Sequence, residues 1–215
     1  MKRLYRKLVF QYSEGGLGRV LQKSILFVLR TLYSENLWNI YVHRASDVVG
    51  PSAPLVQCKA MTFKDLVSAK YYKVVAFPEE IRRRLERNNT CYGFYLDGNL
   101  ATIGWSSNDY MELDRGVNFP CPTEVGLFDF ITLPDFRSRG LYTNALRYLV
   151  RNIHEGGARC IYIAVDPNNL SSVKGIQSAG FSPFLGFRRR KILGIDFQIT
   201  KSLHSKPLAD ESSVS

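Results

Sequence analysis

The sequence predicts a mixed α/β (α+β) domain, in which helices flank a central twisted sheet, preceded by a basic N-terminal extension. Three observations lead to this prediction. Strand patterns and helix patterns alternate from Leu55 to Ser202. Two apolar strands meet at a short turn, and a third leads through a glycine-containing turn into an amphipathic helix. With 215 residues and 45% apolar content, the chain is long enough for one sizeable core and an appendage.

The first 33 residues form a basic amphipathic segment, with apolar residues at helical spacing among lysines and arginines. The longest apolar run, Ile25–Leu29, is far shorter than the roughly 20 residues that a membrane span needs, and no cleaved signal peptide is indicated. Two interpretations stay open: the apolar face packs on the domain, or the segment docks on a membrane surface. Ser46 to Pro54 is interpreted as a linker, so residues 1–54 are assigned to the extension.

The charge of the chain restricts the classes of partner that it is expected to bind. The formal net charge is +10, and residues 1–54 hold eight Lys/Arg against three Asp/Glu. A basic surface attracts nucleic acid, but no helix-turn-helix, zinc-finger or RRM-type pattern accompanies it, so a membrane surface or an anionic substrate is favoured. The run Arg188–Lys191 is interpreted as a solvated turn between strands. The cysteines are widely spaced and the histidines scattered, which indicates neither disulfides nor a metal site and favours the cytoplasm.

Local signals place the elements that follow the linker. Thr62 and Asp65 form a capping box at a helix start. Pro78 suits the first position of a second helix, whose glutamates and arginines match the two ends of the helix dipole. An Asp-Gly-Asn turn after Leu96 indicates a hairpin. In chain order we expect a strand at 55–61, a helix from 63 to about 72, a helix from 78, hairpin strands at 91–96 and 100–105, an irregular connection at 108–122, a strand at 125–133, a helix from 140 to about 154, a strand at 159–165, a helix at 170–179, strands near 181–188 and 192–202, and a disordered tail at 203–215.

The turn after Leu133 has the features of a phosphate site. It reads Pro-Asp-Phe-Arg-Ser-Arg-Gly and opens an amphipathic helix. The first N–H groups of a helix lack internal partners and lie at the positive end of its dipole, so they bind anions. Arg137 and Arg139 add charge, and Gly140 admits close approach. The stretch matches neither GxGxxG nor GxxxxGK[ST], so neither a dinucleotide motif nor a P-loop is present.

Two motifs here resemble the GNAT superfamily of N-acyltransferases. R-x-x-G-x-Y at 137–142 is similar to the family pattern Arg/Gln-x-x-Gly-x-Gly/Ala after a strand. N-L-S-S at 169–172, followed by Gly180-Phe, is similar to the family's Asn-x-x-Ser/Ala and a helix that ends in Gly-Phe. The resemblance covers roughly residues 55–200. It implies an acyltransferase domain at 55–202, built on a mostly antiparallel twisted sheet of six to seven strands.

The resemblance also implies acetyl-CoA as cosubstrate, without a metal, and its pyrophosphate bound to the backbone amides of the first motif. Two residues depart from the family pattern. Tyr142 replaces a small residue, and Ile176 stands where many members carry the tyrosine that protonates the leaving thiolate. A thiolate leaves tolerably without an acid, because the ordinary pKa of a thiol is only about 8.5. The expected cofactor-binding residues are Ile131, Thr132, Leu133, Arg137, Ser138, Arg139, Gly140, Leu141, Tyr142, Asn169 and Ser172.

Three side chains are candidates for the chemistry. Asp129 interrupts an apolar strand, and burial there raises the pKa of a carboxyl, which suits a general base. The alternative is a structural Asp satisfied by backbone amides or an arginine. Glu124, on the same strand, is the second candidate base. Tyr142 is the third candidate, since its hydroxyl would be useful near the thioester. The resemblance places the oxyanion on a backbone N–H near Ile131 or Thr132.

The expected acceptor is a small-molecule or peptide amine. An amino sugar is favoured among these, because the pathways of amino-sugar and surface-polysaccharide chemistry run beside the membrane. The family builds its acceptor pocket from the hairpin and the connection after it. The residues there either bind a cationic amine or form a solvated loop with one core tryptophan. They are Trp105, Asp109, Tyr110, Glu112 and Asp114.

Two functions therefore compete. One is an N-acyltransferase that moves an acetyl or other short acyl group to a primary amine within a ternary complex. The other, suggested by the missing tyrosine at Ile176, is a CoA- or lipid-binding regulatory or adaptor module at a membrane surface. The sequence leaves open a homodimer and a peripheral membrane contact of a cytoplasmic protein through residues 1–33.

Overall fold

The computed structural model describes residues 33–47, 57–68, 78–114, 117–192 and 195–202. The expectations for the segment before Tyr33, most of the linker, the end of the first helix and the tail fall outside these residues. The chain divides into two compact units. Among the described residues, the larger unit comprises 38–186 and Ser202, and the smaller unit comprises 33–37 and 187–201.

The described residues form a mixed α/β architecture, as the sequence predicts. The elements are β1 (Tyr33–Arg44), β2 (Gln57–Ala60), α2 (Phe63–Ser68), α4 (Pro78–Glu86), β3 (Thr90–Leu96), β4 (Asn99–Asp114), β5 (Val117–Thr132), the 3-10 helix η1 (Pro134–Phe136), α5 (Leu141–Glu155), β6 (Cys160–Val165), α6 (Leu170–Ser178), β7 (Ser182–Ile192) and β8 (Ile195–Ser202). Among the described residues, the sheet has eight strands in the order β2-β3-β4-β5-β6-β1-β7-β8. The β5–β6 pairing is parallel, whereas β1–β6, β2–β3, β3–β4 and β4–β5 are antiparallel.

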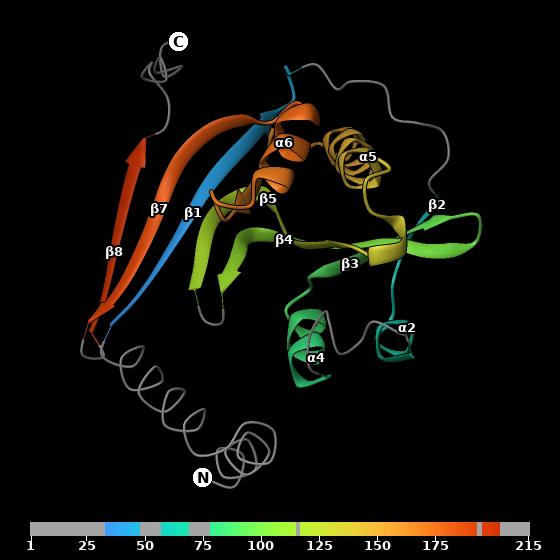
Figure 1. Cartoon of the computed structure of the whole chain (residues 1–215), viewed down its shortest axis with the longest axis horizontal. Coiled ribbons are helices and arrows are strands. Elements are labelled where there is room, and N and C mark those ends of the chain that lie inside the picture. Colours follow the sequence, from blue (N-terminus) through green and yellow to red (C-terminus); the bar gives the residue numbers. More distant parts are fainter. Residues whose placement is uncertain (1–32, 48–56, 69–77, 115–116, 193–194, 203–215) are drawn as a thin grey trace, which may run out of the picture. The chain divides into compact units, whose positions relative to one another are not determined.

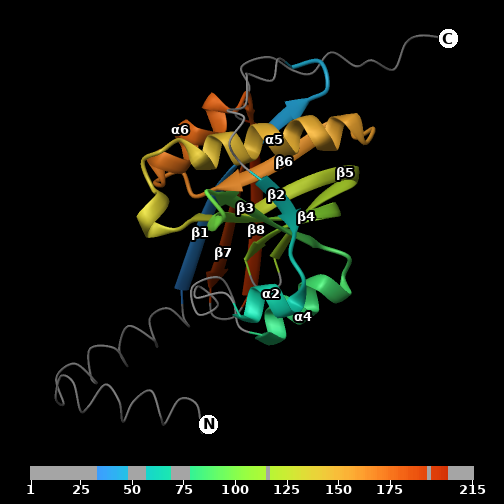
Figure 2. The same ribbon diagram turned by 90° about the vertical axis from the view of Figure 1, so that its right-hand side faces the viewer.

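In the larger unit, helices cover both faces of the sheet. α5 and α6 lie side by side on one face, and α2 and α4 lie on the other (Figures 1 and 2). Leu146, Leu149 and Val150 recur at helical spacing on α5 and are buried in one core with Ile161 and Ile163 of β6. Truncating such a side chain to alanine typically costs about 2–5 kcal/mol, so this core holds α5 firmly against the strands that precede and follow it.

Several short-range predictions are confirmed. The N–H of Thr62 donates to Asp65 Oδ2 at 2.8 Å, and the N–H of Asp65 donates to Thr62 Oγ1 at 3.2 Å, which makes the capping box of α2. α4 begins at Pro78. The β3–β4 hairpin turns at Asp97 and Gly98, both with positive φ.

Residues 108–122 are not the irregular connection that the sequence predicts, because most of them belong to the long strands β4 and β5. The two strands pair through three register shifts. At one shift Asn108 lies opposite Val125, but Asp109 lies opposite Cys121, so three residues of β5 bulge out. These irregularities, together with two prolines in β5, break the apolar alternation by which a strand is recognised.

β1 lies within residues 1–54, which the sequence assigned to the extension. It pairs antiparallel with β6, so that Ile40 lies opposite Ala164 and Val42 opposite Tyr162. Residues 40–43 are all buried, so this stretch has no polar face and shows no alternation in sequence. Residues 38–44 are therefore a strand of the larger unit.

The smaller unit contains the start of β1, the end of β7 and β8. The basic run Arg188–Lys191 belongs to strand β7 and is not the turn that the sequence predicts. Nε of Arg190 lies 2.9 Å from Oε1 of Glu35, and Nε of Arg188 lies 3.4 Å from the same oxygen. Within the residues described, no helix is long and apolar enough to cross a membrane.

Candidate active site

β5 and β6 part from each other in the middle of the sheet. Their parallel pairing joins Val125–Leu127 to Ile161–Ile163, although β5 continues to Thr132 and β6 to Val165. The ladder between the two strands therefore stops five residues before the end of β5 and two before the end of β6. Backbone N–H and C=O groups that leave a ladder need another partner, so this opening suits an extended ligand.

A β-bulge shapes β5 at the opening. Asp129 and Phe130 together lie opposite the single residue Gly104 of β4. Asp129 has a φ of 49°, in the left-handed region that a bulge often requires. A Cβ at Gly104 would lie 2.3 Å from the Phe130 ring, so only glycine leaves room for that ring.

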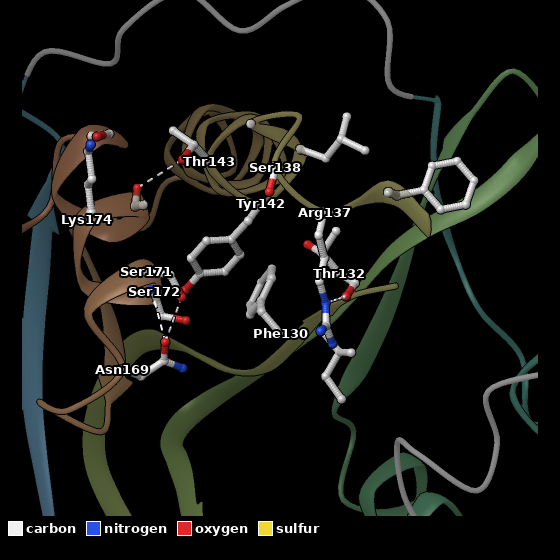
Figure 3. Close-up of a pocket in the computed structure, with 16 residues that line it drawn as sticks. Phe130, Thr132, Arg137, Ser138, Tyr142, Thr143, Asn169, Ser171, Ser172 and Lys174 are labelled. Carbon is white, nitrogen blue, oxygen red and sulfur yellow. Dashed lines mark hydrogen bonds between the residues drawn. The ribbon is translucent and has the colours of Figure 1, made fainter. Parts of the chain in front are cut away.

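A large pocket of about 890 Å³ lies between the C-terminal end of β5, the start of α5 and α6 (Figure 3). Its volume is in the range of small-molecule and cofactor sites. Its lining residues are Phe130, Ile131, Thr132, Phe136, Arg137, Ser138, Gly140, Leu141, Tyr142, Thr143, Asn169, Ser171, Ser172, Lys174, Gly175 and Ser178.

The start of α5 has the geometry that the predicted anion cradle requires. Gly140 is the N-terminal cap residue with a φ of 69°, and no side chain caps the helix there. Its first N–H groups therefore remain available to a ligand at the positive end of the dipole. Nε of Arg137 donates to the Thr132 carbonyl at 3.2 Å, which places its guanidinium beside the end of β5. Lys174 on α6 adds a second positive charge to the lining.

The second motif caps α6. Oδ1 of Asn169 accepts the N–H of Ser172 at 3.2 Å and the hydroxyl of Ser171 at 2.9 Å. This is an N-cap, which a residue with a short polar side chain provides best. Asn169 therefore both starts the helix and lines the pocket (Figure 3).

The structure gathers nine of the eleven expected cofactor-binding residues around this pocket. Leu133 does not line it, because its side chain is fully buried and its N–H donates to Ala101. Arg139 does not line it either, because its guanidinium lies over the ring of Phe136.

The cofactor-binding residues predicted from the sequence do not include several residues of α6 that line the larger pocket. Ser171, Lys174, Gly175 and Ser178 follow the spacing i, i+3, i+4, i+7, so they occupy one face of the helix. That face has small or polar residues where a core helix has large apolar ones, and this signal was readable in the sequence.

Tyr142 is accommodated by a glycine on the neighbouring helix. A Cβ at Gly175 would lie 2.6 Å from Tyr142 Cδ1, and the Tyr142 ring meets Phe130 edge to face with centroids 5.9 Å apart. In Figure 3 the ring projects from α5 toward the first turn of α6. Burial raises the pKa of Tyr142 far above its usual value, so its hydroxyl stays protonated and can donate a hydrogen bond.

A second pocket of about 200 Å³ adjoins the first. Four residues line both pockets: Phe130, Tyr142, Asn169 and Ser172. Three carboxylates, from Glu112, Asp129 and Asp166, line the smaller pocket. The rest of its wall is Trp38, Leu113, Phe128, Ile163, Ala164 and Val165. An acidic wall of this kind suits a cationic ligand.

A buried arginine holds two of these carboxylates. The side chain of Arg84, on α4, is 4% exposed. Its Nη2 lies 2.6 Å from Asp129 Oδ2, and its Nε lies 3.0 Å from Glu112 Oε2. Glu80 binds the same guanidinium at 3.1 Å, and Arg83 also contacts Glu112. The Arg84 guanidinium lies 5.2 Å from the ring centroid of Trp105 and from that of Phe128, which adds cation–π attraction.

The carboxyl of Asp129 binds Arg84 and also faces the smaller pocket, since 45% of its side chain is exposed. Desolvation raises the pKa of Asp129, and the Arg84 guanidinium opposes that shift, while Glu112 and Glu80 add to it. An arginine therefore satisfies Asp129, as the structural alternative predicts, and part of its carboxyl stays open to the pocket.

Other candidates lie elsewhere. Oε2 of Glu124 accepts the N–H groups of Arg159 and Cys160 at 3.1 and 2.7 Å, so Glu124 holds the start of β6 and lines neither of these pockets. Trp105 is fully buried and stacks on Phe128, as the core alternative predicts. Ile176 is fully buried in the core under α6.

Comparison with known proteins agrees with this geometry. The family model described as "Acetyltransferase (GNAT) family" matches residues 60–181, which include most residues of both pockets. No curated protein sequence matches the chain.

Similar solved structures carry the same fold. An acetyltransferase of the GNAT family from Colwellia psychrerythraea has a TM-score of 0.52 and 16% identity over 75% of this chain and 58% of its own. A GNAT-family protein from Novosphingobium aromaticivorans has a TM-score of 0.51 and 17% identity over 73% of this chain and 65% of its own. A glucosamine N-acetyltransferase region of a fungal multi-domain β-N-acetylglucosaminidase has a TM-score of 0.54 and 8% identity over 78% of this chain and 22% of that one. The chain thus spans less than two thirds of these structures.

Proposed function

The chain belongs to the GNAT family of acetyltransferases, and from this premise we propose that it transfers an acetyl or other short acyl group from acetyl-CoA to a primary amine. The observation that carries the proposal is the junction of the two pockets. One pocket has a phosphate cradle, the other has an acidic wall, and four residues are common to both. A thioester and an amine bound in the two pockets meet at these residues.

The residues of the larger pocket fit acetyl-CoA. The uncapped start of α5 would bind the pyrophosphate, with Arg137 and Lys174 adding charge. The free edge of β5 near Ile131 and Thr132 would hold the extended arm and offer a backbone N–H to the carbonyl oxygen. Acetyl-CoA supplies the acyl group as an activated thioester.

Asp129 and Tyr142 are proposed to serve the two proton-dependent steps. Asp129 accepts a proton from the amine as the nitrogen–carbon bond forms, and its raised pKa suits that role. The Tyr142 hydroxyl donates a hydrogen bond to the sulfur as the carbon–sulfur bond breaks. A phenol whose pKa burial raises holds its proton tightly, so it stabilises the thiolate without fully protonating it.

The acceptor class follows from the smaller pocket. Arg83 and Arg84 hold Glu112. The carboxylates of Asp129 and Asp166 are therefore the ones that favour an amine with positive charge. A volume of about 200 Å³ admits only part of a large molecule. An amino sugar fits these limits, as does the terminus of a small aliphatic amine. The glucosamine N-acetyltransferase region that shares the fold acts on an amino sugar.

The test is acceptor-dependent release of free thiol from acetyl-CoA. A panel would contain glucosamine phosphates, aliphatic diamines, amino acids and short peptides, each compared with its N-acetylated form as a matched control. We expect release with at least one cationic amine and none with its acetylated form.

A non-catalytic CoA-binding module is the second candidate, because the buried Ile176 replaces the usual tyrosine. Calorimetric binding of acetyl-CoA without thiol release for any amine would support it and overturn the enzymatic proposal.

A further inference from the structure

Strand β8 exposes a row of large apolar side chains. The exposed fractions of Ile195, Phe197 and Ile199 are 62%, 47% and 49%. They alternate along the strand, so they share one of its faces. β8 is also the last strand in the sheet order, and no other described strand pairs with its outer edge. Soluble proteins seldom leave such a row on an edge strand uncovered, because it invites association.

The neighbouring strand carries a strong positive charge. Arg188 to Lys191 are four consecutive basic residues of β7, so their side chains alternate between its two faces, and Glu35 of β1 pairs with the two on one face, Arg188 and Arg190. By sequence, residues 33–37 and 187–202 hold five Lys/Arg against two Asp/Glu. An apolar row beside a basic tract is the combination that binds an anionic lipid surface. The apolar side chains insert into the lipid, and the basic side chains are attracted to its negative charge.

We propose that β7 and β8 form a membrane-docking surface for anionic lipid bilayers. Ile195, Phe197 and Ile199 insert at the boundary between headgroups and acyl chains, and the long basic side chains of Arg188–Lys191, on the two faces of β7, extend to the lipid phosphates around them. The surface lies in the smaller unit, so the proposal does not depend on the acetyltransferase activity.

Charge argues against two other occupants. A second copy seated on this face would bring two basic tracts together, and like charges across an interface oppose association. The segment before Tyr33 carries seven Lys/Arg against one Asp/Glu, so it would also place positive charge on a positive unit. An anionic surface is the partner that this charge favours.

The experiment is co-sedimentation of the full chain with vesicles of phosphatidylcholine and phosphatidylglycerol, and with phosphatidylcholine alone. One variant removes the apolar row through Ile195→Thr, Phe197→Thr and Ile199→Thr, which keep β propensity. A second removes charge through Arg189→Gln and Lys191→Gln and spares the partners of Glu35. Matched controls remove exposed apolar and basic side chains elsewhere, with Val67→Thr plus Leu170→Thr, and with Arg82→Gln plus Arg87→Gln.

We expect the wild type and both controls to sediment with the anionic vesicles only, and to be released by salt. Both test variants should lose at least tenfold in vesicle affinity. Wild-type binding by the apolar-row variant would overturn the proposal and place the contact elsewhere in the chain. A wild-type dimer that this variant dissociates, without vesicle binding, would show that the face joins two copies.

A second measurement covers the case in which the apolar-row variant misfolds. Phe197→Trp keeps the apolar character and adds a fluorophore. Lipids brominated in the acyl chain should quench this variant more strongly than the wild type, whose tryptophans Trp38 and Trp105 lie outside β8. Equal quenching of the two proteins would also overturn the proposal.

Discussion

Nη2 of Arg84 lies 2.6 Å from Oδ2 of Asp129, although 45 residues separate them in the chain. One residue is on a helix and the other on a strand bulge, so their contact ties α4 to the wall of the smaller pocket. Because Arg84 is buried and Asp129 is half-exposed, the arginine fixes one carboxylate oxygen and leaves the rest of the group open to the pocket.

The first prediction is that Asp129→Asn lowers turnover by roughly 10²–10⁴-fold, the range for losing a general base. Asparagine tolerates the positive φ at this position, so the bulge should persist. Initial rates of thiol release measure the effect. If Asp129→Asn keeps its rate while Glu124→Gln loses it, Glu124 is the base. If neither changes the rate, the amine proton leaves to water or to the substrate itself.

The second prediction concerns pH. The Arg84 guanidinium lowers the pKa of Asp129 against the larger effect of burial. Arg84→Met removes that opposition, so the acid limb of the kcat/KM profile should move to higher pH. It should also cost about 1–3 kcal/mol in unfolding free energy, since the buried Glu112 loses one of its two arginine partners. Arg83→Met is the matched control, because Arg83 binds the same Glu112 but is partly exposed. Equal profiles for the two variants would exclude a positioning role for Arg84.

The third prediction tests the phosphate cradle. Gly140 and Gly98 both have positive φ, and a Cβ at either would meet nothing within 4 Å. Gly140→Asp and Gly98→Asp therefore introduce the same backbone strain and the same charge, but only the first places it in the cradle. We expect Gly140→Asp to lose at least tenfold in calorimetric affinity for acetyl-CoA and Gly98→Asp to keep it. Similar affinities would remove the basis of the cofactor assignment.

The fourth prediction links Tyr142 to Gly175. Alanine usually stabilises an exposed helical position by up to about 1 kcal/mol relative to glycine, but here its Cβ would displace the Tyr142 ring. Gly175→Ala should therefore lower turnover as Tyr142→Phe does, and in a Tyr142→Ala background it should change nothing further. The double-mutant cycle measures this coupling, and additive effects would contradict it. Ile176→Tyr offers no rescue, because Ile176 is fully buried and overpacking costs about 1–3 kcal/mol.

The features that the sequence predicted correctly depend on interactions between residues close together in the chain. Thr62 and Asp65, the Asp97–Gly98 turn and Gly140 each act within a few residues, and each lies where expected. The two motifs contain about half of the residues that line the larger pocket, because a strand, a turn and a helix start place these residues together by local geometry.

What the sequence did not predict depends on distant contacts. Arg84 carries no local sign that it differs from the arginines beside it, since its role follows from Asp129 and Glu112 on other elements. Residues 40–43 of β1 are buried throughout, so no alternation marked them. The acidic wall combines residues of β4, β5 and the segment after β6, which only the folded sheet brings together.

The place of β1 bears on how the protein is made. This strand leaves the ribosome before the rest of the sheet, yet its neighbours β6 and β7 are synthesised near the end of the chain. Its apolar residues therefore stay exposed to solvent while the intervening strands and helices are translated. Pairing of β1 with β6 and β7 is a late step of folding. A fragment that begins at Ser46 should consequently lack the strand between β6 and β7, and its unpaired strand edges should make it aggregate. Co-expression of residues 1–45 as a separate peptide should restore soluble protein.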